Sequence, residues 1–407
     1  MKKYKLGELL EVSRGMSLSG KYFSTKGDLM RLTLGNFDYN NNCFKDDKSK
    51  NNLFYIGKVK PEFILNKGDI ITPLTEQAIG LLGSTAKIPC DNKYIHSQDV
   101  GLIKCSEKLN PNFAFYLISS QLVKNQLSVT AQQTKIRHTS PSKIKDCIVW
   151  IPDYPQQQKI GRILSSIDDK IAINNQINAI LERVARAIYE YYFVQFDFPN
   201  QQGKPYKSSG GAMRFDSTLN RPIPKDFEVK KLADIIIKNT KKAKKDNKKS
   251  LIDLSVMPQN TFCLNLNNIG DAFNTNLFEM QKFDILFGSI RPYLKKAGFA
   301  PFDGLVTGTI HSIKPINPNF FNFILLTLTH KSFFDYAVSV SKGTKMPIIG
   351  YEELSDFKIP FNESVVEKFN TILNFKEIIS NNIIQNQKLK NLRDFLLPLL
   401  INAQVQI

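Results

Sequence analysis

The sequence of 407 residues is poor in cysteine and contains no long apolar run. Its five cysteines are scattered without a close pair, which is typical of a reducing cytoplasm and argues against a disulfide scaffold or a zinc ribbon. No apolar run reaches the length of about 18 residues that a membrane span requires. The opening segment MKKYKLGELLEV is too short and too charged for a secretory signal. These absences predict a cytoplasmic protein that makes no use of a membrane.

Catalytic and metal-binding motifs are missing as well. The sequence has no G-x-S-x-G, no H-E-x-x-H and no G-x-x-x-x-G-K-[ST], since GLLGSTAK at 80–87 lacks the required spacing. The four histidines are scattered, and none has a partner at metal-ligand spacing. Two N-P-N-F tetrapeptides differ from the N-P-P-F type of adenine methyltransferases at the third position, so we interpret them as helix starts. We expect no catalytic residue, no metal and no cofactor bound by this chain.

Positive charge, in contrast, is abundant. Lys and Arg number 55 against 37 Asp and Glu, which gives a formal net charge of +18. Such an excess suits a polyanionic partner, most often nucleic acid, although a Lys- and Asn-rich composition also follows from biased codon usage. The run KNTKKAKKDNKK at 238–249 is either a solvated, flexible segment or a set of phosphate contacts that bind without reading sequence.

A long helix is predicted over 155–193. The segment has no proline or glycine after Gly161, and its apolar residues follow a seven-residue repeat. A helix of this length spans roughly 58 Å, too long for the inside of one small domain, so we expect a spacer with a partner helix. The residues expected in its seam are Ile160, Ile163, Ile167, Asn174, Ile177, Leu181, Val184 and Ile188.

The second half of the chain repeats the first. KGDII at 67–71 matches KFDIL at 282–286, and NPNFAFYLI at 110–118 matches NPNFFNFIL at 317–325. Further matches join Thr134-Lys135-Ile136 to Thr344-Lys345-Met346 and Ile151-Pro152 to Ile359-Pro360, in the same order and at similar offsets. An internal repeat with these landmarks predicts two copies of one domain, each followed by a long helix.

The repeat predicts a second long helix after Pro360, and apolar residues at helical spacing are present there. Each helix can bury its stripe against the other, and two-fold symmetry favours an antiparallel pair over a parallel one. Asn174 and Asn382 lie near the middle of the two helices; they form either a polar pair that fixes the register or a solvated edge. The residues expected in the seam of the second helix are Ile372, Ile379, Asn382, Asn386, Leu389 and Leu396.

The sequence thus predicts an α+β protein with an internal two-fold repeat, in which two strand-rich α/β domains are separated by two long antiparallel coiled-coil helices. The expected parts are an N-terminal domain at 1–152, a central spacer helix at 153–194, an unpacked connector at 195–225, a C-terminal domain at 226–361, and a C-terminal spacer helix with its tail at 362–407.

Loops that mix polar and basic residues are the candidates for contact with DNA bases. Gln can pair with adenine and Arg with guanine in the major groove. Three loops have this composition, TAQQTKIRHTS at 130–140, SIRPYLKK at 289–296 and SVSKGTKM at 339–346. The candidate residues in them are Gln132, Gln133, Lys135, Arg137, Arg291, Lys295, Lys296, Lys342, Thr344 and Lys345.

In the order of its domains and in several sequence segments, the chain resembles the specificity subunits of type I restriction–modification enzymes. The resemblance covers nearly the whole chain and rests on the order domain, helix, domain, helix. The most similar segments are IPDYPQQQKIGRILSSIDDKIAINNQINAILERVARAIYEYYFVQFDF, GKPYKSSGGAM, IPKDFEVKKLADI and LRDFLLPLL.

The resemblance implies a non-catalytic subunit that recognises DNA. Each domain is expected to be a target recognition domain that reads one half of a split site in double-stranded DNA, and the helix pair is expected to set the unread gap. Two modification subunits are expected to dock, bind S-adenosylmethionine and methylate adenine N6. Restriction subunits are expected to add ATP- and magnesium-dependent translocation and cleavage. The resemblance transfers no base-contacting residue.

Other interpretations stay open at this point. A helical-spacer scaffold that bridges two proteins would also have long helices, but its binding to partners would not depend on DNA phosphates or fall steeply with salt. A fused methyltransferase or nuclease would act as a purified chain. Within the favoured class, an orphan subunit would lack the restriction partners.

Overall fold

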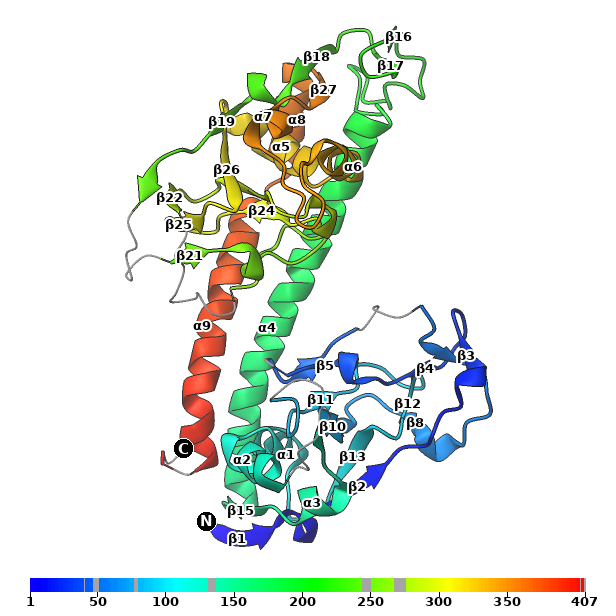
Figure 1. The fold of residues 1–407 in the computed structure, drawn as a ribbon, viewed down its shortest axis with the longest axis vertical. Coiled ribbons are helices and arrows are strands. Elements are labelled where there is room, and N and C mark those ends of the chain that lie inside the picture. The colour runs from blue at the N-terminus through cyan, green and yellow to red at the C-terminus, as the bar shows by residue number, and fades with distance from the viewer. Residues whose placement is uncertain are drawn as a thin grey trace. The chain divides into compact units, whose positions relative to one another are not determined.

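The computed structural model describes residues 1–39, 41–46, 51–76, 80–130, 137–243, 250–266, 276–402 and 404–405. The chain divides into two compact units, whose elements are labelled in Figure 1. Unit 1 contains Met1–Asp169 and Lys390–Ile407, and unit 2 contains Lys170–Leu389. The expected boundaries at 152 and 361 separate each globular domain from the helix that follows it. The observed units are divided differently, because each includes the parts of the two long helices that pack within it.

Unit 1 is built from short, mostly antiparallel strands. Its four-stranded sheet has the order β11 (Ala86–Lys87), β9 (Ile70–Pro73), β13 (Val100–Cys105), β2 (Leu10–Arg14). Its five-stranded sheet has the order β3 (Phe23–Ser24), β7 (Phe54–Tyr55), β4 (Met30–Arg31), β12 (Tyr94–Ile95), β8 (Ile64–Leu65). Three two-stranded pairs are β1 (Lys2–Lys5) with β15 (Ile148–Ile151), β10 (Thr75–Glu76) with β14 (Arg137–His138), and β5 (Phe37–Asp38) with β6 (Cys43–Phe44).

Unit 2 has a similar set of strands. One four-stranded sheet has the order β19 (Ile236–Lys238), β26 (Ile310–Pro315), β23 (Ile285–Gly288), β24 (Ala297–Phe299). The other has the order β20 (Lys242–Ala243), β22 (Leu277–Met280), β25 (Gly304–Thr307), β21 (Leu251–Ile252). Two pairs are β16 (Met213–Asp216) with β17 (Arg221–Pro224), and β18 (Glu228–Lys231) with β27 (Lys358–Phe361).

The helices follow the same order in both units. Unit 1 contains α1 (Pro111–Ile118), α2 (Gln121–Thr130) and α3 (Pro141–Lys145). Unit 2 contains α5 (Phe321–Leu328), α6 (Lys331–Val340), α7 (Tyr351–Ser355) and α8 (Glu363–Ile372). The remaining two helices, α4 (Tyr154–Tyr189) and α9 (Lys376–Ile401), each contribute to both units.

The internal repeat is confirmed at the level of local structure. In both units an early strand pairs antiparallel with a strand that precedes a helix, as β1 with β15 before α4 and β18 with β27 before α8. A 3-10 turn follows β1 and β18 alike, where the Glu8 carboxylate accepts the Lys5 N–H at 2.9 Å and the Asp234 carboxylate accepts the Lys231 N–H at 2.9 Å. The two N-P-N-F segments begin helical turns, capped by Asn110 in unit 1 and by Asn317 in unit 2.

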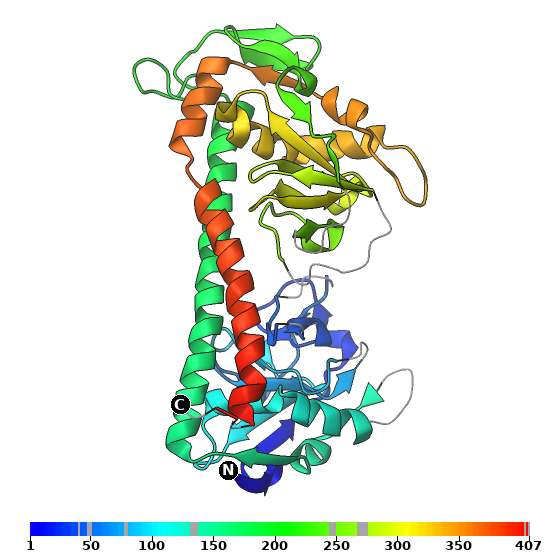
Figure 2. The same cartoon turned by 90° about the vertical axis from the view of Figure 1, so that its left-hand side faces the viewer.

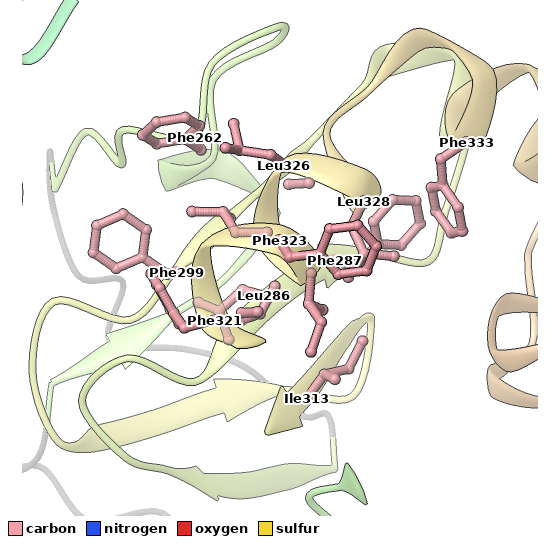
Figure 3. Close-up of a cluster of buried hydrophobic side chains, with 14 of the residues drawn as sticks. Phe262, Leu286, Phe287, Phe299, Ile313, Phe321, Phe323, Leu326, Leu328 and Phe333 are labelled. Carbon is pink, nitrogen blue, oxygen red and sulfur yellow. The ribbon is translucent and has the colours of Figure 1, made fainter. Parts of the chain in front are cut away.

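Each unit has its own hydrophobic core. In unit 1 the side chains of α1 pack with β-strand residues, with Ile160 and Leu164 of α4, and with Leu400 of α9. In unit 2 phenylalanines dominate, and Figure 3 shows side chains from α5 among those of the neighbouring strands. Phe287 of β23 and Phe333 of α6 make an edge-to-face contact there with ring centroids 5.3 Å apart. The long helices are therefore part of both cores rather than bare spacers.

Helix α4 confirms the long helix that the sequence predicts. The Asp153 carboxylate caps its start by accepting the Gln156 N–H at 3.0 Å. A π-helical turn at Glu190–Val194 ends it, and this turn places Tyr192 and Phe193 in the core of unit 2. No helix in the described ranges is long and apolar enough to cross a membrane.

The two long helices run antiparallel, as expected from the symmetry of the repeat. In both views α9 lies alongside α4 (Figures 1 and 2). Within unit 2, Asn174 bonds to Asn386, and Asn178, further along α4, bonds to the earlier residue Asn382. Partner numbers that fall as α4 numbers rise establish the antiparallel direction.

The expected seam of α4 is partly wrong, because one of its two stripes is displaced by one residue. The buried positions of α4 are Ile160, Leu164, Ile167, Ile171, Asn174, Asn178, Glu182, Ala185 and Tyr189. Ile177 and Val184, which we expected in the seam, are 37% and 45% exposed. Ile163, Leu181 and Ile188 are only partly buried. The helix carries two apolar stripes, and sequence spacing alone does not decide which one faces α9.

The C-terminal helix is interrupted, which corrects the expectation of one continuous spacer. Helix α8 ends at Ile372 and α9 begins at Lys376. The buried amide of Asn322 donates to the carbonyl of Leu373 at 2.8 Å, which satisfies a helix-end acceptor. Phe375 is buried and stacks on Phe262 with ring centroids 5.4 Å apart. Because α8 turns toward the core of unit 2, Ile372 is 53% exposed rather than in the seam.

In α9 the buried positions include Ile379, Ile383, Asn386 and Arg393, whereas the expected seam residues Asn382, Leu389 and Leu396 are half-buried. Arg393 was not expected in a helix seam, because its charge must be paired to be buried.

The connector at 195–225 is packed, contrary to our expectation. Strands β16 and β17 form a hairpin in it, and the Asp216 carboxylate accepts the N–H groups of Thr218 and Leu219 at the turn. Phe196 and Phe198 are buried in the core of unit 2. The Gly-, Pro- and Ser-rich composition forms tight turns here, while these two aromatic residues supply the packing.

Candidate nucleic-acid interface and helix pair

The structure places the candidate DNA-contacting loops against equivalent segments in the two units. In unit 1, β10 pairs with β14, so that Glu76 lies opposite Arg137. In unit 2, an isolated bridge joins Ile290 to Ile348, and the Arg291 N–H donates to the Pro347 carbonyl at 2.7 Å. The loop after the second helix of each unit therefore meets the segment that follows the central strand of its sheet.

Matching turns place these segments equivalently in the two copies. The Asp69 carboxylate accepts the Asn66 N–H at 2.8 Å, and the Asp284 carboxylate accepts the Gln281 N–H at 3.0 Å. The residue before each aspartate has a positive φ, +88° at Gly68 and +70° at Phe283. The similarity of KGDII and KFDIL in the sequence thus reflects one turn that starts the strand leading to the candidate site.

Arg137 is held inside the fold of unit 1. Its Nη1 lies 3.0 Å from the carboxylate of the buried Glu76, and its Nη2 donates to the carbonyl and hydroxyl of Ser128 at 2.6 and 2.9 Å. The other oxygen of Glu76 accepts N–H groups of residues 80–82 at 2.7 to 3.3 Å. The guanidinium of Arg137 therefore shapes the loop, and fewer of its donors remain for a DNA base.

The basic residues of unit 2 are more accessible. Arg291 and Lys295 flank the 3-10 turn η8 (Pro292–Leu294) in left-handed conformations, with φ of +51° and +53°. Arg291, Thr344 and Lys345 are exposed, and in the described part of the chain no carboxylate lies within ion-pair distance of Arg291 or Lys345. Tyr293, between the two flanking residues, is 51% exposed.

Two candidates of unit 2 have partners within the unit, and three candidates of unit 1 are not described. Lys296 donates from Nζ to the Leu254 carbonyl at 2.6 Å. Lys342 donates to Glu353 at 2.6 Å, and this bond raises the pKa of Lys342 and lowers that of Glu353. The candidates Gln132, Gln133 and Lys135 lie outside the described residues.

The different environments of the two arginines predict different effects of their removal. Arg137→Ala should lower the free energy of unfolding of unit 1 by about 2–3 kcal/mol, because it leaves a buried carboxylate without its cation. Arg291→Ala should change the stability of unit 2 by only about 0.5 kcal/mol, because the side chain is exposed. Chemical denaturation of both variants measures this, and equal effects on stability would contradict the structural role of Arg137.

Asparagines form a polar ladder between α4 and α9 in unit 2. The Asn174 amide donates to Asn386 at 2.9 Å, the Asn386 amide donates to Asn175 at 2.8 Å, and the Asn382 amide donates to Asn178 at 2.8 Å. Asn174 is fully buried. The expected candidates Asn174 and Asn382 thus each bond to another asparagine rather than to one another. A shift of register would leave these amides unpaired, so the ladder favours one alignment.

A charged cluster that the sequence did not reveal joins the two helices in unit 1. Arg393 of α9 donates from Nη1 to the Asp168 carboxylate of α4 at 2.9 Å. The other oxygen of Asp168 accepts the hydroxyl of Tyr116 in α1 at 2.6 Å. Burial and Asp168 raise the pKa of Tyr116, which keeps its hydroxyl a donor. This cluster ties both helices to the globular part of unit 1.

A second buried carboxylate has the matching role in unit 2. Glu182 of α4 binds Arg186 at 2.7 Å, the Thr261 hydroxyl at 2.5 Å and the Phe262 N–H at 3.3 Å. Arg186 also donates to the Thr329 carbonyl at 2.9 Å. An Asp or Glu at a buried position of the helix repeat is the sequence signal for such an anchor. The signal can be recognised only when it is known which positions of the repeat are buried.

An exposed apolar stripe follows α4 in unit 2. Its members are Ile173, Ile177, Ile180, Val184 and Tyr191, which are 37% to 50% exposed. Their spacings of three, four and seven residues place them on one helix face. This is the second apolar stripe of the helix, and we refer to these five residues as the outer stripe.

Comparisons with known proteins agree with the architecture. Residues 1–183 match the family model described as the type I restriction modification DNA specificity domain. The MjaIX specificity subunit of Methanocaldococcus jannaschii is 23% identical over 313 residues, which cover 72% of this chain and 69% of the relative. Residues 1–183 thus match a DNA specificity domain of type I restriction–modification systems, and the chain is similar over most of its length to a type I specificity subunit.

Other specificity subunits are similar to this chain over smaller or larger spans. The HindI specificity subunit of Haemophilus influenzae is 36% identical over 91 residues, or 21% of this chain and 19% of the relative. The crystal structure of the S subunit from M. genitalium has the same fold, with a TM-score of 0.60 at 15% identity, covering 98% of this chain and 96% of that chain. In the described ranges no group of three or more His, Cys, Asp and Glu side chains could hold a metal ion.

Proposed function

We propose that this chain is the non-catalytic DNA-recognition subunit of a type I restriction–modification enzyme, in which each unit reads one half of a bipartite target in the major groove. The observation that carries the proposal is the meeting of the same two segments in both copies of the repeat. In unit 2 these segments present Arg291 and Lys345 without a carboxylate partner among the described residues. Arginine binds guanine in the major groove, and lysine binds guanine or phosphate.

The two units should read different half-sites. Glu76 in unit 1 and Arg291 in unit 2 occupy equivalent positions, each seven residues after the aspartate of its turn. One is a buried carboxylate and the other an exposed cation. The Glu76 carboxylate is bonded to Arg137 and to backbone N–H groups within unit 1, whereas the exposed Arg291 guanidinium can donate to guanine, so equivalent positions offer different groups to the DNA.

In this proposal the helix pair sets the number of unread base pairs between the halves. The asparagine ladder favours a single register, so the pair behaves as a spacer of defined length. Joining the two readers also raises the effective concentration of the second reader at its half-site once the first has bound.

The proposed partners supply the chemistry that this chain lacks. Two modification subunits would bind S-adenosylmethionine and methylate adenine N6, and restriction subunits would use ATP and magnesium. The formal charge of +18 suits the DNA partner. The outer stripe suits the modification subunits, because an exposed apolar helix face is typical of a surface that a partner helix covers.

Footprinting of the assembled methyltransferase on DNA tests the recognition proposal. Two protected half-sites separated by sequence-independent base pairs are expected, together with binding that falls steeply as salt increases. One continuous recognised run, or binding to a protein partner without dependence on DNA, would instead favour a scaffold.

Substitutions in the outer stripe should weaken the binding of modification subunits without lowering the stability of the chain. Ile177→Glu combined with Val184→Glu should reduce the affinity for the modification subunits at least tenfold, because two charges would be buried in the interface. The isolated chain should keep its melting temperature, since both side chains are already exposed. Calorimetric titration measures the affinity, with Gln176→Glu and Ala179→Glu, also exposed on α4, as the control pair. Equal losses in both pairs would exclude the stripe as the docking face.

A further inference from the structure

A cavity of about 620 Å³ lies in unit 2, where the end of α4, the α5–α6 turn, the connector hairpin and β27 meet. Its volume is within the range of ligand sites. Aromatic rings of Tyr189, Phe193 and Phe357 line it, together with Arg221 and Lys358. It is formed by residues other than those of the candidate DNA interface, and three of its features point to one kind of occupant.

The first feature is an open strand edge. The Leu232 N–H donates to the Phe357 carbonyl at 2.9 Å, so these two residues form a hydrogen-bonded pair. Hydrogen-bonded and non-hydrogen-bonded pairs alternate along antiparallel strands. The next residue, Lys358, therefore points its N–H and C=O away from β18. Lys358 lines the cavity, and β27 has no strand neighbour on that side in the described chain. No hydrogen-bond partner for either group is present among the described residues.

The second feature is the contrast with unit 1, where the same edge is closed. Ile148 of β15 is equivalent to Lys358. There the Gln126 side chain accepts the Ile148 N–H at 2.8 Å and donates to the Ile148 carbonyl at 2.8 Å. A primary amide thus bonds to the strand edge as a peptide group would. The equivalent residue of α6 is Tyr336, whose hydroxyl donates instead to the Glu353 carbonyl at 2.8 Å.

The third feature is a half-buried cation without a counter-anion. Arg221 donates to the Phe193 carbonyl at 3.2 Å and lies over the ring of Phe196 at 4.8 Å. Among the described residues no carboxylate lies within ion-pair distance of Arg221. The nearby acids are occupied, since Glu190 bonds to His330 at 3.2 Å and Asp356 bonds to Lys231 at 2.7 Å. Burial lowers the pKa of Arg221, as expected for a cation that has lost water without gaining an anion.

We propose that this cavity is a docking site for an extended, acidic peptide segment of a protein partner. The backbone of the segment would add to the open edge of β27 at Lys358, in the manner of strand addition. An apolar side chain would contact the aromatic wall, and a carboxylate would pair with Arg221, a charge-assisted bond that is strong where water is excluded. The proposal is separate from DNA recognition and from the outer stripe.

The purified full chain and a fluorescent hexapeptide of alternating phenylalanine and aspartate test the proposal by anisotropy. A second hexapeptide with asparagine in place of aspartate should bind at least tenfold more weakly. Arg221→Gln should weaken binding of the acidic peptide by about tenfold or more and should abolish the preference. Arg183→Gln, which removes an exposed positive charge of α4 outside the cavity, is the matched control and should change nothing.

Tyr336→Gln is the sharper variant, because it introduces the residue that closes the edge in unit 1. It should weaken both peptides, whereas Tyr336→Phe, which keeps the ring, should weaken neither. Melting temperatures show whether each variant is folded. Equal binding of both peptides, or binding that Arg221→Gln and Tyr336→Gln leave unchanged, overturns the proposal. DNA binding by the same preparations is measured separately, so a failure of peptide docking and a failure of DNA recognition are distinguishable.

Discussion

Arg393→Ala should lower the free energy of unfolding of unit 1 by about 3–5 kcal/mol, the range found when one partner of a buried ion pair is removed. The side chain of Arg393 is only 7% exposed. Besides Asp168, it contacts Asp394 at 2.9 Å and the carbonyl of Asn41 at 3.3 Å. Burial alone would lower the pKa of Arg393, but Asp168 and Asp394 raise it above its ordinary value. Without the guanidinium, the Tyr116 hydroxyl would be the one remaining hydrogen-bond partner of Asp168 among the described residues.

The measurement is chemical denaturation followed by the fluorescence of Trp150, the single tryptophan of the chain, which lies on β15 of unit 1. Arg162→Ala, an exposed arginine on α4, is the matched control and should cost about 0.5 kcal/mol or less. A double-mutant cycle with Asp168→Ala isolates the pair itself. The double variant should be less destabilised than the sum of the two single variants. Additive losses would show that the two side chains do not interact.

Inserting four residues into both long helices should lengthen the unread gap of the DNA target by one to two base pairs. Four helical residues add about 6 Å, and each base pair of DNA adds about 3.4 Å. The insertions belong between Asn178 and Ala179 in α4 and between Asn381 and Asn382 in α9, because these points face one another in the asparagine ladder. Affinity for the original site should fall more than a hundredfold, since one half-site would no longer be in reach.

Selection of bound sequences from a randomised DNA library measures both the gap and the bases that are read. The bases of each half-site should stay the same, because neither reading unit is altered. The same four residues placed after Gly203, in an exposed turn of the connector where a side chain would meet no neighbour, are the control and should leave the gap unchanged. An unchanged gap after insertion into both helices would exclude the role of the helix pair as a spacer.

The parts of the fold that could be predicted are those that depend on local pattern. The long helix, the repeat and the helix starts at the two N-P-N-F segments all follow from residues close in sequence, and the structure confirms them. The antiparallel direction was also predicted, because it follows from the symmetry of the repeat. The connector was misjudged, since its composition is typical of a loop while two phenylalanines pack it into the core of unit 2.

Which residues of α4 face α9 could not be predicted, because α4 has two apolar stripes with similar numbers of apolar residues. The sequence favoured Ile163, Ile177 and Val184, whereas the structure buries Leu164, Asn178 and Ala185 one residue later. The buried stripe contains polar residues, so the sequence does not mark it as apolar. Asn178 is stable at a buried position only because the Asn382 amide donates a hydrogen bond to it. The break before α9 could not be predicted for a similar reason. It depends on the Asn322 side chain of α5, which donates to the Leu373 carbonyl at the break.

For the candidate site, the sequence predicts the segments but not whether each side chain in them is accessible. The loops at 130–140, 289–296 and 339–346 stand out by composition, which a single sequence shows. Whether a basic residue in them is accessible depends on partners far away in the chain. Glu76, 61 positions before Arg137, binds that guanidinium, while Arg291 has no carboxylate partner among the described residues.

The amino-acid sequence by itself therefore determined the duplicated architecture and the long helices, since periodicity, helix starts and repeated sequence segments are local properties. The tertiary structure decided which stripe of α4 meets α9, which charges are buried in pairs, and which strand edge remains open beside a cavity. These depend on residues distant in the chain, because a buried amide or charge is stable only where a specific partner reaches it.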